Sequence, residues 1–305
     1  MLVRQMKNAD WMGVRSLTEK SVIEHIHSLF RHNLAPGSVP KFDSTVHPSI
    51  VGLISPHAGY ACSGPVAAHG YYQVGVERQK ADLVIIAGPN HHGGVPFALP
   101  PHEAWETPLG TVPIAHDIVK RIEASRKTLE KPIRSYVQLD ESAHRHEHSI
   151  ELQLPFLQAI LDEFSILPIG ISGSFDEITD PQVNVLSNLV KEAVKEANMT
   201  NILVIASTDF THGNYFPRLN HDAVKEMDQH AIDEILNFSK EEIKLREVII
   251  KWNISMCGYL AVRFVLNLCS ELGATKAECL KYATSGETCG GKDAVVGYAS
   301  ICLKR

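Results

Sequence analysis

The chain has 305 residues, of which 44% are hydrophobic, so it can bury a sizeable core, and disorder of the whole chain is excluded. Its 29 basic and 35 acidic residues give a formal net charge of −6, which provides no basic surface for nucleic acid or an anionic membrane. No segment approaches the roughly 20 apolar residues of a membrane span, and the N-terminal residues lack the apolar core of a secretion signal. We therefore expect a cytoplasmic protein that binds neither nucleic acid nor membrane.

Apolar, β-branched runs of strand length alternate along the chain with stretches of helical length. Pro65 suits the first turn of a helix, and an apolar stripe marks the helix that begins at Ile150. Strands that alternate with helices predict an α/β fold with a largely parallel or mixed central sheet and helices on both faces. Without a repeat or a long linker, one α/β domain over residues 1–305 is the simplest organisation. In chain order we expect strand 50–54, helix 65–76, strand 83–87, helices 118–126 and 150–161, strand 166–171, helix 181–197, strand 202–206, helices 223–236 and 258–272, and strand 295–301.

The cysteines are sparse for a chain of this length, form no CxxC pair and accompany no secretion signal. The sequence therefore favours reduced thiols, most of them packed in the interior, although an even number would allow disulfides. The six are Cys62, Cys257, Cys269, Cys279, Cys289 and Cys302.

Three of the expected strands run into polar loops that contain histidine. His57 follows strand 50–54, the pair His91 and His92 follows strand 83–87, and Asp209 and His212 follow strand 202–206. In open α/β sheets ligands bind at the carboxyl ends of the strands, so these loops converge on one crevice if their strands are neighbours. A single histidine after a strand is more often a surface or hydrogen-bonded group, so the prediction depends on the coincidence of three loops. Only one of the adjacent pair is expected to face the crevice.

A fourth segment, residues 143–151, carries three histidines and two acidic residues ahead of an apolar helix. If this segment is helical, His144, His148 and Glu151 share one face and could supply acid/base groups. A solvated helix start, with acidic residues near the positive end of the helix dipole, explains the same composition. Both interpretations stay open.

Cys257 precedes the helix expected at 258–272. Amide donors and the helix dipole at a helix N-terminus lower the pKa of a cysteine, so this position favours thiolate. Two neighbouring imidazoles would complete a ligand set suited to iron, copper or zinc. From the sequence alone, a packed and inert Cys257 is the simpler interpretation.

Seven ordered blocks, which span nearly the whole chain, resemble the Memo family, whose fold is related to the class III extradiol ring-cleaving dioxygenases. The blocks are NADW at 8–11, SPHAGYACSG at 55–64, GPNHH at 88–92, EHSIELQLPF at 147–156, STDFTHG at 207–213, MCG at 256–258 and TSGETCGGKDAVVGYAS at 284–300.

The resemblance implies a pocket for one metal ion at the strand ends. In it His57, His91 and Cys257 match the metal-binding positions, Asp209 and His212 match other pocket positions, and His148 is a further candidate. The ring-cleaving relatives hold Fe(II) with two histidines and a carboxylate. A thiolate at the third position donates more charge and is itself oxidisable, which argues against ordinary ring cleavage.

The leading hypothesis is a metal-dependent oxidoreductase that uses oxygen and a small reducing substrate, with Fe(II) favoured and copper or zinc as alternatives. His212, oriented by Asp209, is the candidate proton acceptor, and His148 is the reserve. A second hypothesis is a non-catalytic binding or adaptor protein whose crevice receives an anionic or phosphorylated peptide. A zinc hydrolase has the least support, since only the His, His and Cys set favours it.

Overall fold

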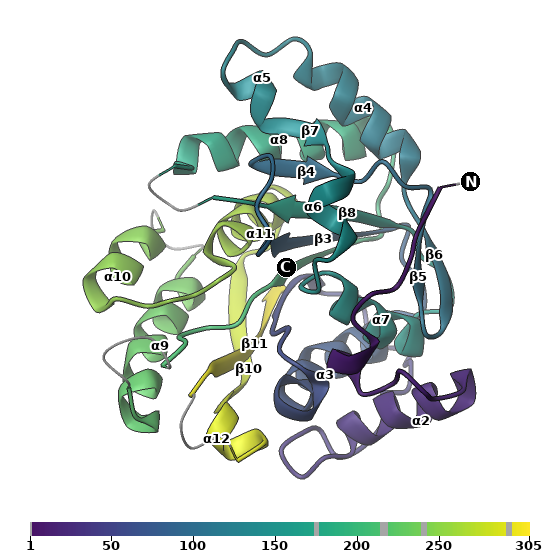
Figure 1. Ribbon diagram of the computed structural model, residues 1–305, viewed down its shortest axis with the longest axis vertical. Helices are drawn as coiled ribbons and strands as arrows, with labels where there is room; N and C mark the ends of the chain where they lie inside the picture. The colour runs from purple at the N-terminus through teal and green to yellow at the C-terminus, as the bar shows by residue number, and fades with distance from the viewer. Residues whose placement is uncertain (1, 174–176, 214–218, 239–242, 291–294) are drawn as a thin grey trace.

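An eight-stranded mixed sheet forms the centre of the molecule, in the order β10-β11-β2-β9-β3-β8-β4-β7 (Figure 1). The computed structural model describes residues 2–173, 177–213, 219–238, 243–290 and 295–305. The four inner strands are parallel and buried along their whole length, because both of their faces are covered. They are β2 (Ile50–Ser55), β9 (Ile202–Ser207), β3 (Leu83–Pro89) and β8 (Ile166–Ile171).

The outer strands make the sheet mixed, which confirms the predicted α/β class. Antiparallel neighbours are β11 (Gly297–Lys304) beside β2, β10 (Lys276–Thr284) beside β11, and β4 (Phe97–Leu99) beside β8. β7 (Val137–Leu139) pairs with β4 in parallel. A separate three-stranded sheet is formed by β1 (Val3–Arg4), β5 (Ala104–Thr107) and β6 (Gly110–Pro113).

Helices cover both faces of the large sheet (Figure 1). The chain steps from β2 to β3 in one direction along the sheet and from β8 to β9 in the other, so right-handed crossovers place α3 and α8 on opposite faces. The helices α2 (Glu19–Phe30) and α7 (Leu154–Ile160) pack with α3 (Tyr60–Glu77), whereas α11 (Tyr259–Glu271) packs with α8 (Asp180–Glu196). Farther out lie α4 (His116–Arg126), α9 (His221–Leu236) and α10 (Leu245–Trp252). Within the described ranges, no helix is long and apolar enough to cross a membrane.

Short helical segments connect these elements: α1 (Ala9–Met12), α5 (Ile133–Tyr136), α6 (Glu141–Arg145), the 3-10 helix η1 (Glu151–Gln153) and α12 (Ser285–Thr288). The single helix expected at 150–161 is therefore divided into η1 and α7. The expected place of Pro65 in a first turn is also wrong, because α3 begins at Tyr60 and encloses the proline. The earlier start follows from the Gly59 carbonyl, which accepts the backbone N–H groups of Cys62 and Ser63.

A disulfide joins Cys62, in the first turn of α3, to Cys289, directly after α12. The expectation of reduced thiols is wrong for these two residues, although Cys257, Cys269, Cys279 and Cys302 are free. The two half-cystines are 227 residues apart in the sequence. They meet because β11, which follows Cys289, pairs with β2, which precedes Cys62. Residues 291–294, part of the last sequence block, lie outside the described residues.

Replacing both Cys62 and Cys289 by serine is expected to lower the free energy of unfolding by about 2–5 kcal/mol, because the bridge closes a very long loop in the unfolded chain. Guanidinium denaturation without reductant measures the change. Cys279→Ser, at a half-buried free thiol, is the matched control and should leave stability nearly unchanged. Equal stability of the native protein and the double variant would contradict the expectation.

Candidate metal centre

The three histidine-bearing loops predicted from the sequence meet at one edge of the sheet. β9 lies between β2 and β3 and is parallel to both, so the carboxyl ends of all three strands are adjacent. The loops that follow them carry His57, His91 and Asp209. This arrangement is the crevice at strand ends that open α/β sheets use for ligands.

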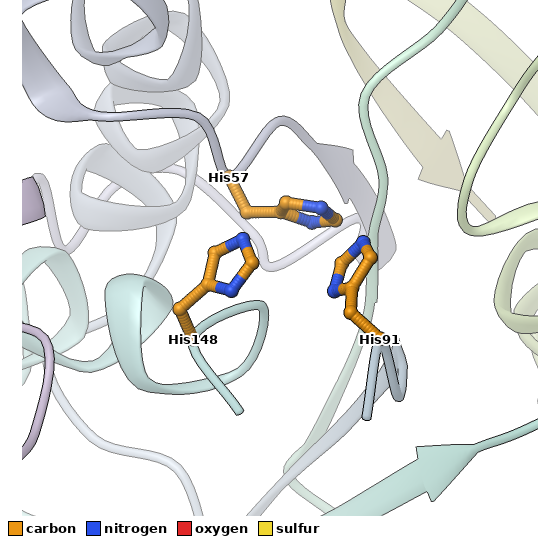
Figure 2. Close-up of side chains that lie close together, drawn as sticks. All are labelled: His57, His91 and His148. Carbon is orange, nitrogen blue, oxygen red and sulfur yellow. The ribbon is translucent and has the colours of Figure 1, made fainter. Parts of the chain in front are cut away.

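Three imidazoles point toward one another at this edge (Figure 2). One ring nitrogen each of His57, His91 and His148 lies within 4.8 Å of the other two, a spacing that could hold a metal ion. The ring centroids of His91 and His148 are 4.8 Å apart, and that of His57 lies 5.5 Å from His91 and 5.4 Å from His148. We call these three residues the histidine cluster.

A hydrogen-bond network at Ser207 sets the protonation of His57. The Ser207 hydroxyl donates to the Ser149 carbonyl at 2.6 Å and accepts from the Gln153 side-chain amide at 2.8 Å. Its only proton is thus engaged, so the contact of 2.9 Å with His57 Nδ1 requires that Nδ1–H donates to Ser207 Oγ. His57 Nε2 then carries a lone pair, and it lies 3.4 Å from Cys257 Sγ.

Glu147 determines which ring nitrogen of His91 carries the proton in its neutral form. Its Oε1 accepts the backbone N–H groups of His148 and Ser149 and lies 3.0 Å from His91 Nδ1, while its Oε2 accepts the His91 backbone N–H at 2.6 Å. Because the carboxylate accepts at Nδ1, the other ring nitrogen of His91 is left as a donor atom for a metal. A carboxylate that orients a ligating histidine in this way is the usual second partner in metal sites.

Burial and charge separate the pKa values of these groups. Burial, with the nearby His91, lowers the pKa of His57 to about 3, and burial, with the nearby His57, lowers the pKa of His148 to about 4. Burial also opposes protonation of His91, but its contact with Glu147 outweighs this and raises its pKa. Burial alone would raise the pKa of Glu147, yet the same contact and the backbone donors hold it well below its usual value. His57 and His148 are therefore neutral near pH 7, the form that binds metals.

Cys257 lies beside His57, just before α11. Its Sγ accepts the backbone N–H of Asp209 at 3.4 Å. The expectation that its position favours thiolate is wrong for the metal-free chain, because burial, with the charge of Asp209, raises the pKa of Cys257. A bound metal ion would be needed to displace the proton.

Asp209 and His212 lie at the same edge, but each has contacts that the sequence did not indicate. Asp209 Oδ1 accepts the backbone N–H groups of His57 at 2.9 Å and Ala58 at 3.3 Å, and so fixes the His57 loop. Burial raises the pKa of Asp209. Ser255 positions His212: its hydroxyl accepts the His212 backbone N–H, and its carbonyl lies 3.1 Å from His212 Nδ1. Since a carbonyl only accepts, Nδ1 carries the proton and Nε2 is the basic nitrogen.

The segment 143–151 is not one helix, because α6 ends at Arg145 and a turn precedes η1. His148 reaches the histidine cluster, whereas His144 is fully buried against Trp105. Glu151 forms a buried ion pair with Arg4, whose guanidinium also donates to the carbonyls of His144 and Glu147. Arg4, near the N-terminus of the chain, therefore holds residues 144–151 in place.

The sequence analysis also missed Trp11, whose ring centroid lies 4.3 Å from that of His148. Trp11 is 48% exposed, so it forms an outer wall beside the cluster. The tryptophan in the block NADW was the available signal in the sequence. Glu147 was noted only as one of the two acidic residues of segment 143–151. Its pairing with His91 depends on the turn before η1, and hydrophobic periodicity does not predict such a turn.

Asp228, on α9, anchors the loop that carries His212. It is fully buried, and its carboxylate accepts the Thr211 backbone N–H at 2.9 Å and the Tyr282 hydroxyl at 2.7 Å. Burial raises the pKa of Asp228 from 3.8 to about 6. The loop therefore depends on a carboxyl group that titrates above the usual range.

Comparison with known proteins shows a consistent set of relatives. A family model described as Memo-like protein matches residues 16–302. A MEMO1 family protein of Ignicoccus hospitalis is 40% identical over 288 residues, which cover 92% of both chains. Another, of Saccharolobus solfataricus, is 38% identical over 273 residues, which cover 88% of both chains.

The fold is also similar to that of a solved structure. An uncharacterised protein of Escherichia coli K12 matches with a TM-score of 0.51 at 9% sequence identity, covering 83% of this chain and 99% of that one. At this identity the match concerns the fold alone. It agrees with the mixed α/β sheet described above.

Glu147→Gln is expected to lower the affinity for Zn(II), used as a probe, by roughly 10- to 100-fold, because His91 loses the charged partner that orients it. Competition with a chromophoric chelator measures the affinity. Glu163→Gln, at an exposed carboxylate paired with Lys80, is the control and should change nothing. An unchanged affinity in Glu147→Gln would mean that His91 needs no such partner.

Asp228→Asn should change how stability depends on pH. A carboxyl whose pKa is raised stabilises the folded state fully below its unfolded pKa of 3.8, and this contribution is lost as pH rises through about 6. From pH 4 to pH 7.5 the native protein should therefore lose about 2.5 kcal/mol relative to Asp228→Asn. Urea unfolding at the two pH values measures this, and parallel pH profiles would refute it.

Proposed function

Because this chain belongs to the Memo-like family, we propose that its histidine cluster binds one transition-metal ion and that the protein is a metal-dependent oxidoreductase. The observation that carries the proposal is the hydrogen bonding of His57 and His91. Ser207 accepts from Nδ1 of His57 and Glu147 accepts from Nδ1 of His91. In the neutral form of each ring the other nitrogen then carries a lone pair, at a spacing suited to a metal.

The donor atoms decide which metals fit. Imidazole nitrogen and cysteine sulfur suit iron, copper and zinc, whereas magnesium and calcium prefer oxygen ligands. We favour Fe(II), with copper or zinc as alternatives. Bound there, a redox-active metal would supply the electron transfer between oxygen and a small reducing substrate.

Two residues compete for the third ligand position. Cys257 matches the family position and lies 3.4 Å from His57 Nε2, whereas His148 completes the group of three closely spaced donors. We assign the two other polar residues of the site a role in proton transfer and a role in positioning. His212 Nε2 is our proposed proton acceptor, since Nδ1 donates to the Ser255 carbonyl. Asp209 is a positioning residue for the His57 loop.

Binding of an anionic or phosphorylated peptide is the weaker alternative. With pKa values of about 3 and about 4, His57 and His148 carry no charge near neutral pH, and a proton on His91 is neutralised by Glu147, so the cluster attracts an anion weakly. The same neutrality favours metal binding, because only an unprotonated imidazole nitrogen can coordinate. A zinc hydrolase keeps the least support, since no further residue set favours it.

Metal analysis of protein purified without oxygen, after separate loading with Fe(II), Cu(I) and Zn(II), tests the proposal. We expect near-stoichiometric metal in the native protein and its loss in His57→Ala and His91→Ala. Comparison of Cys257→Ala with His148→Ala then identifies the third ligand, because only the true ligand lowers retention strongly. If none of the three metals binds the native protein, the proposal fails.

His212→Ala is expected to abolish oxygen consumption with any reductant that the native protein oxidises, while it retains its metal, because the proton acceptor is removed. An oxygen electrode and elemental analysis of the same sample provide the two measurements. Unchanged turnover would exclude His212 as the proton acceptor. Loss of metal would instead make it a ligand.

A further inference from the structure

A cavity of about 160 Å³ lies beside Cys257, between the ends of β3 and β8 and the first turn of α11. Its lining is mixed: the polar Cys257 and Tyr259 and two glycines contribute to it beside five apolar residues. The apolar residues are Pro89, Ile171, Met256, Leu260 and Ala261.

The cavity adjoins the candidate metal centre at two points. Cys257 lines the cavity, and its Sγ lies 3.4 Å from His57 Nε2. Pro89, at the end of β3, lines it as well and precedes His91 by two residues. Cys257 is therefore shared between the surroundings of the histidine cluster and this cavity.

The walls of the cavity are held in place by the fold. Ile171 ends β8, and Ala261 lies in the first turn of α11, where they are 4% and 1% exposed. Met256 and Leu260 are each 6% exposed. Ile171, Leu260 and Ala261 belong to regular elements, so these walls are in place before any ligand arrives, and preformed pockets are the usual small-molecule sites.

Size and chemistry limit the occupant. An apolar cavity of about 150 Å³ is large enough for one benzene molecule. None of the described residues that line the cavity carries a charge, so a charged group would lose hydration there without gaining an ionic partner and is disfavoured. The cavity fits a single six-membered ring or a branched alkyl group.

We propose that this cavity is the specificity pocket of the metal centre. The substrate is a small molecule whose polar group lies at the histidine cluster and whose apolar group, no larger than one ring, fills the cavity beside Cys257. This inference rests on the proposed function, since it requires a metal at the cluster.

The test uses the Co(II)-loaded full chain and two probes, imidazole and 4-phenylimidazole, with the visible spectrum of the cobalt as the readout. Both probes offer the same kind of nitrogen to the metal, and only the second carries a ring for the cavity. We expect 4-phenylimidazole to bind the native protein at least about tenfold more tightly than imidazole, because the phenyl group leaves water. Ala261→Leu, which fills the cavity, should abolish this difference.

Ala159→Leu is the matched control, because it makes the same change at a half-buried position of α7 outside the cavity. It should keep the tenfold difference. If Ala261→Leu does not fold, Ile171→Ala replaces it. By enlarging the cavity, it should raise the affinity for 4-(1-naphthyl)imidazole relative to 4-phenylimidazole.

The outcomes separate this inference from the function on which it rests. If cobalt does not bind, the metal centre fails and the inference with it. If cobalt binds but imidazole leaves its spectrum unchanged, the metal centre stands and the inference is refuted, because the metal offers no position for a ligand. If imidazole binds but the phenyl group adds no affinity, the specificity pocket is refuted while the metal centre stands. If 4-phenylimidazole still binds Ala261→Leu tenfold more tightly than imidazole does, the specificity pocket is refuted as well.

Discussion

The buried carboxylate of Glu147 is the constraint on which the histidine cluster depends. It is 1% exposed and accepts from three backbone N–H groups and from the ring of His91. A charge can be buried at this depth only where such donors replace its water. Because the donors come from the loop after β3 and from the turn before η1, the carboxylate fixes the distance between two loops. The stacking of His91 on His148 follows from that distance.

The inner strands were predictable because each is an apolar, largely β-branched run buried on both faces. β10 was missed because it lies at the sheet edge with many side chains partly exposed, which leaves no continuous apolar run. α2 could have been found, since Val22, Ile26 and Phe30 are buried at helical spacing. The Cys62–Cys289 bridge was hidden, because it depends on which strands become neighbours.

For the site, the sequence placed His57, His91 and His212 at one edge because each follows a strand. It did not indicate their hydrogen-bond partners, which depend on turn conformation. It also gave the wrong direction for the pKa of Cys257, because a position before a helix says nothing about burial or about the charge of Asp209. The sequence thus predicted where the site residues lie in the fold, but it did not predict their protonation states.

The place of β11 in the sheet has a consequence for synthesis on the ribosome. Among the described strands β11 comes after all the others along the chain, yet it lies between β10 and β2 (Figure 1). Its first residue, Gly297, exchanges backbone hydrogen bonds with Phe210 and Thr211, next to His212. Until β11 has been made, the edge of β2 that pairs with it stays unpaired. The loop that carries His212 then also lacks its hydrogen bonds to Gly297. The loop that carries His212 therefore reaches its final contacts only when β11 has taken its place in the sheet.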